Sequence, residues 1–211
     1  MVAADRWADA EGIRCLYLPV PADCLAAVRV AEERGFRLVG ARATSVLDLS
    51  IEADAADAPR DGVLIRTVHI TDVARLEEIA AGAHTSTRFY VDPLFSRAAC
   101  DRLYRTWIRR SCEGWADHVL VADSGTDAVG YLTLHAGAEK EGRIGLVGVA
   151  AEMRGHGIGL ALMRAALAWC RANGMRRLTV ATQAHNLRAL QLYARCGFQP
   201  AGLDFWFHKW R

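Results

Sequence analysis

The sequence predicts an α/β (α+β) protein, because strand and helix patterns follow each other along most of the chain. An apolar run at 146–149 meets a turn with glycine at 155, 157 and 159, and an alanine- and leucine-rich helical stretch follows. Three apolar runs with tight polar connections, at 118–122, 128–135 and 143–150, predict consecutive antiparallel strands. A strand–helix–strand pattern stands near each end of the chain.

Composition and charge are those of an ordinary globular protein. The 211 residues, 52% hydrophobic and 24% charged, can bury a sizeable core in one large or two small domains. A net charge of +2 gives no reason to expect nucleic acid or a membrane surface as a partner, and no apolar run reaches the roughly 18 residues of a membrane span. The N-terminus lacks the basic start and apolar core of an export signal, so we expect a cytoplasmic protein. The six cysteines form no Cys-x-x-Cys pair, and we expect free thiols and no metal.

The first strand–helix–strand pattern resembles the last one. It predicts a strand (Cys15–Val20), a helix (Cys24–Arg34, with Asp23 as N-cap) and a strand (Arg37–Leu49). Shifting the sequence by 162 positions gives seven identities: Leu16, Ala22, Leu25, Ala27, Gly35, Phe36 and Gly40 fall on Leu178, Ala184, Leu187, Ala189, Gly197, Phe198 and Gly202. We infer an internal repeat whose N-terminal copy has no phosphate loop, and we expect this copy to pack and not to catalyse.

An acidic stretch of small residues, Ser50–Gly62, separates this copy from the rest of the chain. It contains Pro and Gly and is typical of a linker. The sequence therefore predicts a small N-terminal β-α-β domain, residues 1–58, and a main domain, residues 59–211.

The main domain starts with a strand at 63–68, followed by two helices, the first capped by Thr71 and the second by Ser96. The three antiparallel strands come next, then the glycine turn and a helix, Ile158–Asn173, that is apolar nearly all round and should be largely buried. A strand (177–182), a helix ended by Gly197 and two final strands complete the domain. The final strands carry Phe205, Trp206, Phe207 and Trp210.

The glycine turn predicts an anion site. A strand, a glycine loop and a helix start place free backbone N–H groups and the positive end of the helix dipole at one spot, as a phosphate group requires. Arg154 adds a positive charge beside the glycines. The alternative is a glycine-rich turn without a ligand.

The run Arg154-Gly-His-Gly157-Ile-Gly159, preceded by Val149, is similar to the acyl-coenzyme-A signature Arg/Gln-x-x-Gly-x-Gly/Ala of the GCN5-related N-acetyltransferases (GNAT). The order of the predicted elements, βααβββαβαββ, also matches that family. The resemblance spans about 150 residues and implies a mixed central sheet flanked by helices. It makes residues 59–211 the catalytic domain and acetyl-CoA the acyl donor.

The same resemblance implies site residues. In the family, the strand before the loop splays from the next one, and the donor's pantetheine arm enters the gap. The implied donor contacts here are Val147, Val149, Arg154, Gly155, His156, Gly157, Ile158, Gly159, Asn186 and Leu192. The thioester carbonyl should lie near the Val149 N–H. The segment Leu192-Tyr193-x-x-x-Gly197-Phe198 is similar to the family's Leu-Tyr-x-x-x-Gly-Phe, in which the Tyr is the usual general acid. Asn186 and Tyr193 are seven residues apart, about two helical turns, so both should point the same way.

The general base is not identified by the sequence, because the strand before the loop carries no carboxylate. His84, Asp92, His118, His135 and a chain of waters remain alternatives. For the acceptor, the stretch Arg88–Phe95 with Tyr104 and Trp107 resembles the dTDP-fucosamine acetyltransferase branch of the family, which acetylates a dTDP-linked amino sugar. An arginine with aromatic rings suits a nucleotide diphosphate sugar, and we expect Arg88, Phe89, Tyr90 and Asp92 to bind the substrate.

Three hypotheses follow. The first is an N-acetyltransferase for a nucleotide-linked amino sugar. The second is the same fold acting on another amine, such as a protein N-terminus, an antibiotic or a polyamine. The third is an acyl-CoA-binding module without turnover, against which Asn186 and Tyr193 argue. A homodimer is left open.

Overall fold

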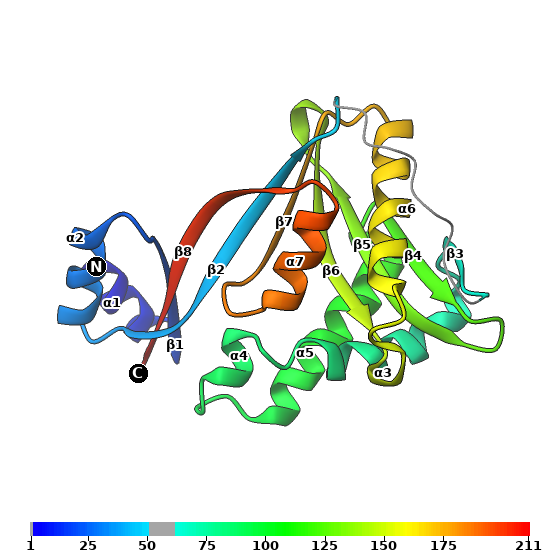
Figure 1. Cartoon of the computed structure of the whole chain (residues 1–211). Coiled ribbons are helices and arrows are strands. Elements are labelled where there is room, and N and C mark those ends of the chain that lie inside the picture. Colours follow the sequence, from blue (N-terminus) through cyan, green and yellow to red (C-terminus); the bar gives the residue numbers. More distant parts are fainter. Residues whose placement is uncertain (1, 51–61) are drawn as a thin grey trace.

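A computed structural model describes residues 2–50 and 62–211, whose eight strands form one sheet in the order β1-β8-β2-β7-β6-β5-β4-β3 (Figure 1). The strands are β1 (Cys15–Pro21), β2 (Arg37–Asp48), β3 (Leu64–Thr67), β4 (His118–Asp123), β5 (Ala128–Ala136), β6 (Glu141–Val149), β7 (Arg177–Gln183) and β8 (Gln199–Trp210). The α-helices are α1 (Val2–Ala10), α2 (Leu25–Glu33), α3 (Val73–Ala83), α4 (Arg88–Val91), α5 (Arg97–Arg110), α6 (Ile158–Ala172) and α7 (Leu187–Arg195). The β6–β7 pair is parallel and the other strand pairs in the described part of the chain are antiparallel, so the predicted mixed sheet is confirmed.

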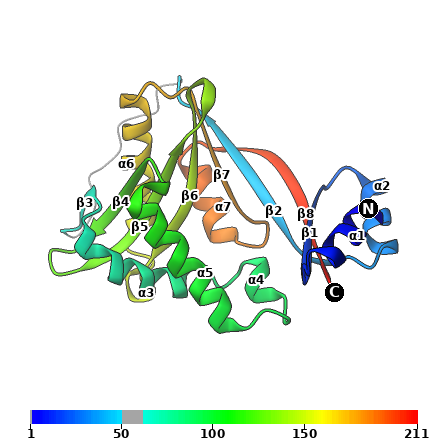
Figure 2. The same cartoon turned by 180° about the vertical axis from the view of Figure 1, so that it is seen from behind.

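Helices cover both faces of the sheet. α6 packs on β4, β5 and β6, and its buried side chains share a core cluster with Leu132 and Leu134 of β5. α3 and α5 pack against each other, and their cluster includes Tyr131 of β5. Because successive side chains of a strand point to opposite faces, these two clusters lie on opposite sides of the sheet. Figures 1 and 2 show α6 and α7 on one face and α3 and α5 on the other.

The units β1–α2–β2 and β7–α7–β8 have the same lengths, and each strand or helix of the first begins and ends 162 residues before its counterpart. Their pairing repeats as well. Cys15 pairs with Trp210, and the shifted pair, Arg177 with Asp48, also occurs. Arg42 and Asp204 are equivalent positions and pair with each other. The two units are therefore related by an approximate two-fold axis that passes between β2 and β8.

β2 lies between β7 and β8, so the two units share one sheet. The division into domains at residue 58 stays a prediction, because that boundary and most of the predicted linker, Ser50–Gly62, lie outside the described residues.

The prediction of two final strands is wrong. β8 is one strand of 12 residues that pairs on one side with β1 and on the other with β2. Because β2 takes the place beside β7, β8 does not need to fold back as a hairpin. Both of its edges are used within this chain, so they are not free to pair with a second copy.

Two predicted helix caps are also wrong. α2 has Cys24 as its N-cap in place of Asp23, and no side chain caps it. A 3₁₀ turn, Ile70–Asp72, precedes α3, and the Asp72 carboxylate accepts a hydrogen bond from the His69 backbone N–H at 2.7 Å. The N-cap of α3 is therefore Asp72 and not Thr71, and no side chain accepts a cap hydrogen bond from the first turn of this helix. Ser96 is confirmed as the cap of α5, where its hydroxyl accepts from the Ala99 N–H at 3.3 Å.

α6, which we expect to be largely buried, is buried along one face and mostly half-buried elsewhere. Its buried residues are Ile158, Leu162, Met163, Ala166, Leu167 and Cys170, while the rest are half-buried or exposed. Among residues 2–50 and 62–211, no helix combines the length and apolar character needed to cross a membrane.

Candidate active site

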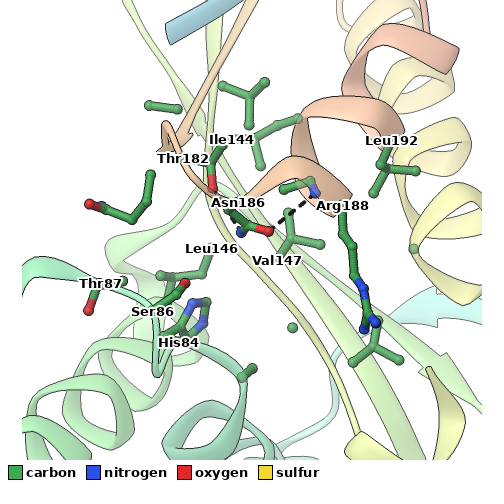
Figure 3. A pocket seen from close by; sticks show the side chains of 18 of the residues that line it. His84, Ser86, Thr87, Ile144, Leu146, Val147, Thr182, Asn186, Arg188 and Leu192 are labelled. Atoms are coloured by element: carbon green, nitrogen blue, oxygen red, sulfur yellow. Dashed lines mark hydrogen bonds between the residues drawn. The ribbon is translucent and has the colours of Figure 1, made fainter. Parts of the chain in front are cut away.

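A cavity of about 1080 Å³ lies where β6 and β7 separate. The two strands pair only from Glu141–Arg177 to Arg143–Thr179, and beyond that point they diverge. The cavity is lined by both strands, by the loop 153–159, by the start of α7 and by the segment 83–89 that follows α3. Figure 3 shows labelled side chains of β6, β7, α7 and the segment 83–89 around one space. The predicted splay of the two strands is therefore present.

The second half of β6 has an edge that pairs with no other strand of the described residues. The Ala150 N–H donates to the Val129 carbonyl at 2.9 Å, on the β5 side. Since backbone groups alternate along a strand, the N–H and C=O groups of Val147 and Val149 face the opposite side, toward the gap. The Val149 carbonyl accepts a hydrogen bond from Arg154 Nε there, at 3.3 Å. This edge fits the predicted pairing with an amide-containing arm.

The loop before α6 has the backbone geometry of an anion cradle. Gly155 and Gly157 have φ of +87° and +79°, values that residues with a Cβ rarely adopt. Gly157 is the N-cap of α6, and no side chain caps this helix. Its first N–H groups are therefore left for a ligand, at the positive end of the helix dipole. Gly155, Gly157, Ile158 and Gly159 line the cavity, but His156 does not, since its ring is exposed and lies 3.2 Å from the Arg154 carbonyl.

Two arginines lie at this end of the cavity. Arg154 Nη2 donates to the Gly82 carbonyl at the end of α3, at 3.2 Å, which holds the guanidinium between α3 and the loop. Arg188 also lines the cavity, and the sequence analysis does not identify it. Its position in the first turn of the helix that carries Tyr193 is a pattern that could have indicated it. Figure 3 shows its side chain extending from the start of α7 into the cavity region.

The start of α7 is fixed by Asn186. Its Oδ1 accepts from the Ala189 N–H at 3.3 Å, and its Nδ2 donates to Thr182 Oγ1 at 3.1 Å (Figure 3). Two turns later, Tyr193 is buried and lines the cavity together with Asn186 and Leu192. Burial raises the pKa of the Tyr193 phenol to about 12, so the hydroxyl keeps its proton at neutral pH.

Among the four side chains considered as general base, His84 lines the cavity and the other three do not. The His84 ring stacks on Tyr104 with 4.6 Å between centroids, and its Nε2 is 2.9 Å from the Tyr131 hydroxyl. Burial, and then the charge of Arg154, lower the pKa of His84 to about 4. The imidazole is therefore neutral at pH 7.

The remaining candidates lie elsewhere. His118 stacks on Trp169 of α6 at 4.8 Å, and His135 packs near Trp115 at 5.8 Å. The Asp92 carboxylate is buried, where Oδ2 lies 2.7 Å from His208 Nδ1 and 2.9 Å from Trp210 Nε1.

Of the four residues predicted to bind the acceptor, two line the cavity. Arg88 and Phe89 line the cavity, whereas Asp92 and Tyr90 do not. The Tyr90 hydroxyl donates to Asp101 Oδ1 at 2.6 Å, which turns it toward α5. Arg42 of β2 and Trp206 of β8 also line this end, and the sequence alone did not identify them.

The charge of the cavity lining has one sign. It contains five arginines and neither Asp nor Glu: Arg42, Arg88, Arg143, Arg154 and Arg188. Such a lining favours anionic ligands at both ends and disfavours polycationic ones. Within residues 2–50 and 62–211, no three His, Cys, Asp or Glu side chains gather as a metal-binding group.

Comparisons with known proteins identify relatives of this chain. The chain is 34% identical over 142 residues to a dTDP-fucosamine acetyltransferase of Escherichia coli O6:H1, which covers 66% of this chain and 60% of that protein. It is 26% identical over 196 residues to the spore coat polysaccharide biosynthesis protein SpsD of Bacillus subtilis, covering 92% of this chain and 66% of the relative. The chain thus spans about two thirds or less of the length of these curated relatives.

Solved structures show the same fold. A tandem GNAT protein from the clavulanic acid biosynthesis pathway superposes with a TM-score of 0.70 at 19% identity, over 99% of this chain and 67% of that one. The profile of the Acetyltransferase (GNAT) family matches residues 76–198, which include the splayed strands, the glycine loop and α7. The chain therefore belongs to the GNAT family of acetyltransferases, whose acyl donor is acetyl-CoA.

Proposed function

We propose that this protein is an acetyl-CoA-dependent N-acetyltransferase that acetylates the amino group of a nucleotide-linked (dTDP) amino deoxysugar. The observation that carries the proposal is a single cavity that joins an anion cradle to an arginine- and aromatic-lined wall and contains no carboxylate. Acetyl-CoA and a nucleotide diphosphate sugar are both anions, so a lining with five arginines suits the two of them at once.

At the donor end, the residues fit acetyl-CoA. The backbone N–H groups of the loop 155–159 would bind its pyrophosphate, and Arg154 and Arg188 lie beside them. The free edge of Val147 and Val149 would pair with the amides of its pantetheine arm. Acetyl-CoA supplies an acetyl thioester, and the chain's part is to hold that thioester where an amine can reach it.

Tyr193 would supply the proton for the departing sulfur. Attack forms the bond between the amine nitrogen and the acetyl carbon, and the carbon–sulfur bond breaks as the thiolate leaves. Free thiols have a pKa of about 8.5, so a thiolate leaves more readily when a nearby acid protonates it. The buried phenol of Tyr193, with its pKa of about 12, is fully protonated at neutral pH and can donate.

The attacking amine has to be neutral and must lose a proton. With no carboxylate in the lining, the available acceptors are water and the neutral imidazole of His84. A pKa of about 4 makes His84 a weak base, which suits a weakly basic amine better than an alkylamine such as lysine. An amino group on a deoxysugar is such an amine, because the neighbouring oxygens withdraw electrons.

The acceptor wall supports a nucleotide sugar. The Arg88 guanidinium lies 4.3 Å from the Phe89 ring centre and 3.9 Å from the Trp206 ring centre. The aromatic rings can stack on a nucleotide base, and the arginine beside them can pair with phosphate. The relative named dTDP-fucosamine acetyltransferase points to the same acceptor class.

A thiol-release assay with acetyl-CoA and a panel of amines tests the proposal. We expect turnover with dTDP-4-amino sugars, and weak or no turnover with polyamines, peptides with a free N-terminus and aminoglycoside-type antibiotics. Activity on one of these other amines and none on nucleotide sugars would favour another acceptor on the same fold. Acetyl-CoA binding without turnover on any amine would favour a non-catalytic binding module.

A further inference from the structure

The N-terminal unit contributes two residues of β2 to the cavity lining, Arg42 and Thr44, and Arg42 is the charged one. Arg42 of β2 lines the acceptor end, and its Nη2 donates to Asp204 Oδ2 of β8, the equivalent position, at 3.0 Å. Asp204 itself does not line the cavity. The N-terminal unit therefore contributes a guanidinium to a cavity that is lined mainly by the rest of the chain.

Arg42 is one of two arginines that contact the same indole ring. The guanidinium carbons of Arg42 and Arg88 lie 5.1 Å and 3.9 Å from the centre of the Trp206 ring. Arg88 has no carboxylate partner among residues 2–50 and 62–211. Burial lowers the pKa of Arg88, and the charge of Arg42 lowers it further, so the two cations are close enough to repel each other.

Three N–H groups of this cluster lack hydrogen-bond partners within the described residues. Arg42 Nε, Arg88 Nε and Trp206 Nε1 are buried, and none of them has a hydrogen-bond acceptor in the described part of the chain. Leaving a buried donor unsatisfied costs free energy, and three such donors at one end of one cavity are explained if a ligand supplies the acceptors. Trp107 Nε1, which also lines the cavity, is a fourth donor of this kind.

We propose that Arg42, Arg88 and Trp206 form a binding site for the diphosphate of the acceptor, so that the N-terminal unit takes part in substrate recognition. This inference rests on the proposed function and names the residues that would select its substrate. A carboxylate carries one charge and fits a single guanidinium in a bidentate manner. Arg42 and Arg88 place two guanidiniums on one indole, and each has an Nε–H without a partner among the described residues. This pair matches a diphosphate, which has two charged phosphate groups with oxygens on both.

The test measures binding of dTDP, which has no amine and cannot be acetylated. Isothermal titration is carried out with the protein saturated with coenzyme A, so that the loop 154–159 is filled and dTDP cannot bind there. We expect Arg42→Gln and Arg88→Gln each to weaken dTDP binding by about tenfold or more, with acetyl-CoA affinity unchanged. Thymidine, which has no phosphate, should bind much more weakly than dTDP.

Two control variants separate recognition from a structural role. Asp204→Asn removes the same ion pair as Arg42→Gln but keeps the guanidinium, so dTDP should bind as well as in the wild type or more tightly. Arg37→Gln removes an exposed arginine of the same strand that does not line the cavity, and should leave dTDP binding unchanged. Equal losses in Asp204→Asn and Arg42→Gln, or equal affinity for dTDP and thymidine, would overturn the proposal.

The two proposals fail in different ways. If Arg42-dependent dTDP binding occurs in a protein that acetylates no amino sugar, the diphosphate site stands and the proposed acceptor does not. If a dTDP-amino sugar is acetylated with the same KM by the wild type and Arg42→Gln, the proposed function stands and the diphosphate site does not.

Discussion

The two units of the repeat share their backbone and differ in their chemistry. α7 carries Asn186 and Tyr193 on the cavity side, while the equivalent positions of α2 are Cys24 and Ala31. Ala31 is fully buried in a small core cluster, where a phenol would not fit without displacing its neighbours. The same strand–helix–strand geometry therefore lines the cavity with a phenol in one unit and buries a small apolar residue in the other.

The neighbours of each unit explain this difference. β7 lies beside β6, which diverges from it and is followed by the glycine loop, so α7 faces a cavity. β1 is an edge strand with no strand on its outer side within the described residues. Among the described residues, the N-terminal unit has no neighbouring strand and glycine loop of this kind, and it contributes to the cavity only through β2, which lies beside β7.

The largest effect that this comparison predicts is on turnover. Tyr193→Phe removes the proton donor and should lower kcat by about 10²- to 10⁴-fold, or about 3–5 kcal/mol, with acetyl-CoA affinity unchanged. Ala31→Gly alters the equivalent position of the other unit and should leave kcat per folded molecule as it is. Steady-state kinetics with an acceptor from the panel and acetyl-CoA titration measure both. A wild-type kcat in Tyr193→Phe would show that Tyr193 is not the proton donor and that the two units do not differ in this respect.

The second prediction concerns His84, which lines the cavity and belongs to neither unit. Its pKa is about 6.5 in an unfolded chain and about 4 in the folded protein. Between these pH values the unfolded chain binds the extra proton, so the stability of the fold decreases as the pH falls from 6.5 to 4. Cavity water screens part of this effect, which we place at no more than about 3 kcal/mol.

Denaturant unfolding of the wild type and His84→Gln at pH 7, 5.5 and 4 isolates this contribution, because the other titrating groups are common to both proteins. As the pH falls from 7 to 4, the wild type should lose free energy of unfolding relative to His84→Gln. A gap that is constant from pH 7 to pH 4 would mean that His84 does not titrate in this range.

The smallest predicted effect is on stability, from changes to the helix caps at the two equivalent positions. Asn186→Ala removes the side-chain acceptor of the Ala189 N–H and should cost about 1 kcal/mol of stability without ligand. Cys24→Ala should cost close to nothing, because Cys24 is exposed and makes no cap hydrogen bond. Thermal unfolding of the two variants measures the difference. Equal losses would show that the caps do not distinguish the units.

Features that depend on neighbours in the sequence could be predicted from it. The glycine loop, the strand before it and the Asn186–Tyr193 spacing are local patterns, and the structure places these residues along one cavity. The repeat could also be read from the sequence, because its period has no insertions.

Features that depend on strand partners could not be predicted. A strand pattern shows which residues share a face, but not which strand lies beside it. The insertion of β2 between β7 and β8 was therefore missed, and with it the cavity positions of Arg42 and Trp206. The buried position of Asp92 could not be predicted for the same reason. Its carboxylate contacts ring nitrogens of His208 and Trp210, which lie 116 and 118 positions later in the chain.

The edge strand β1 has a further consequence for how molecules of this protein meet. The Ala22 N–H donates to the Leu203 carbonyl, so even-numbered residues of this strand direct their N–H groups inward, and odd-numbered ones direct theirs outward. Pro19 and Pro21 stand at outward positions and have no N–H to offer. A strand from another molecule that approached this edge would find two hydrogen bonds missing in succession, which discourages fibre-like growth from this end of the sheet.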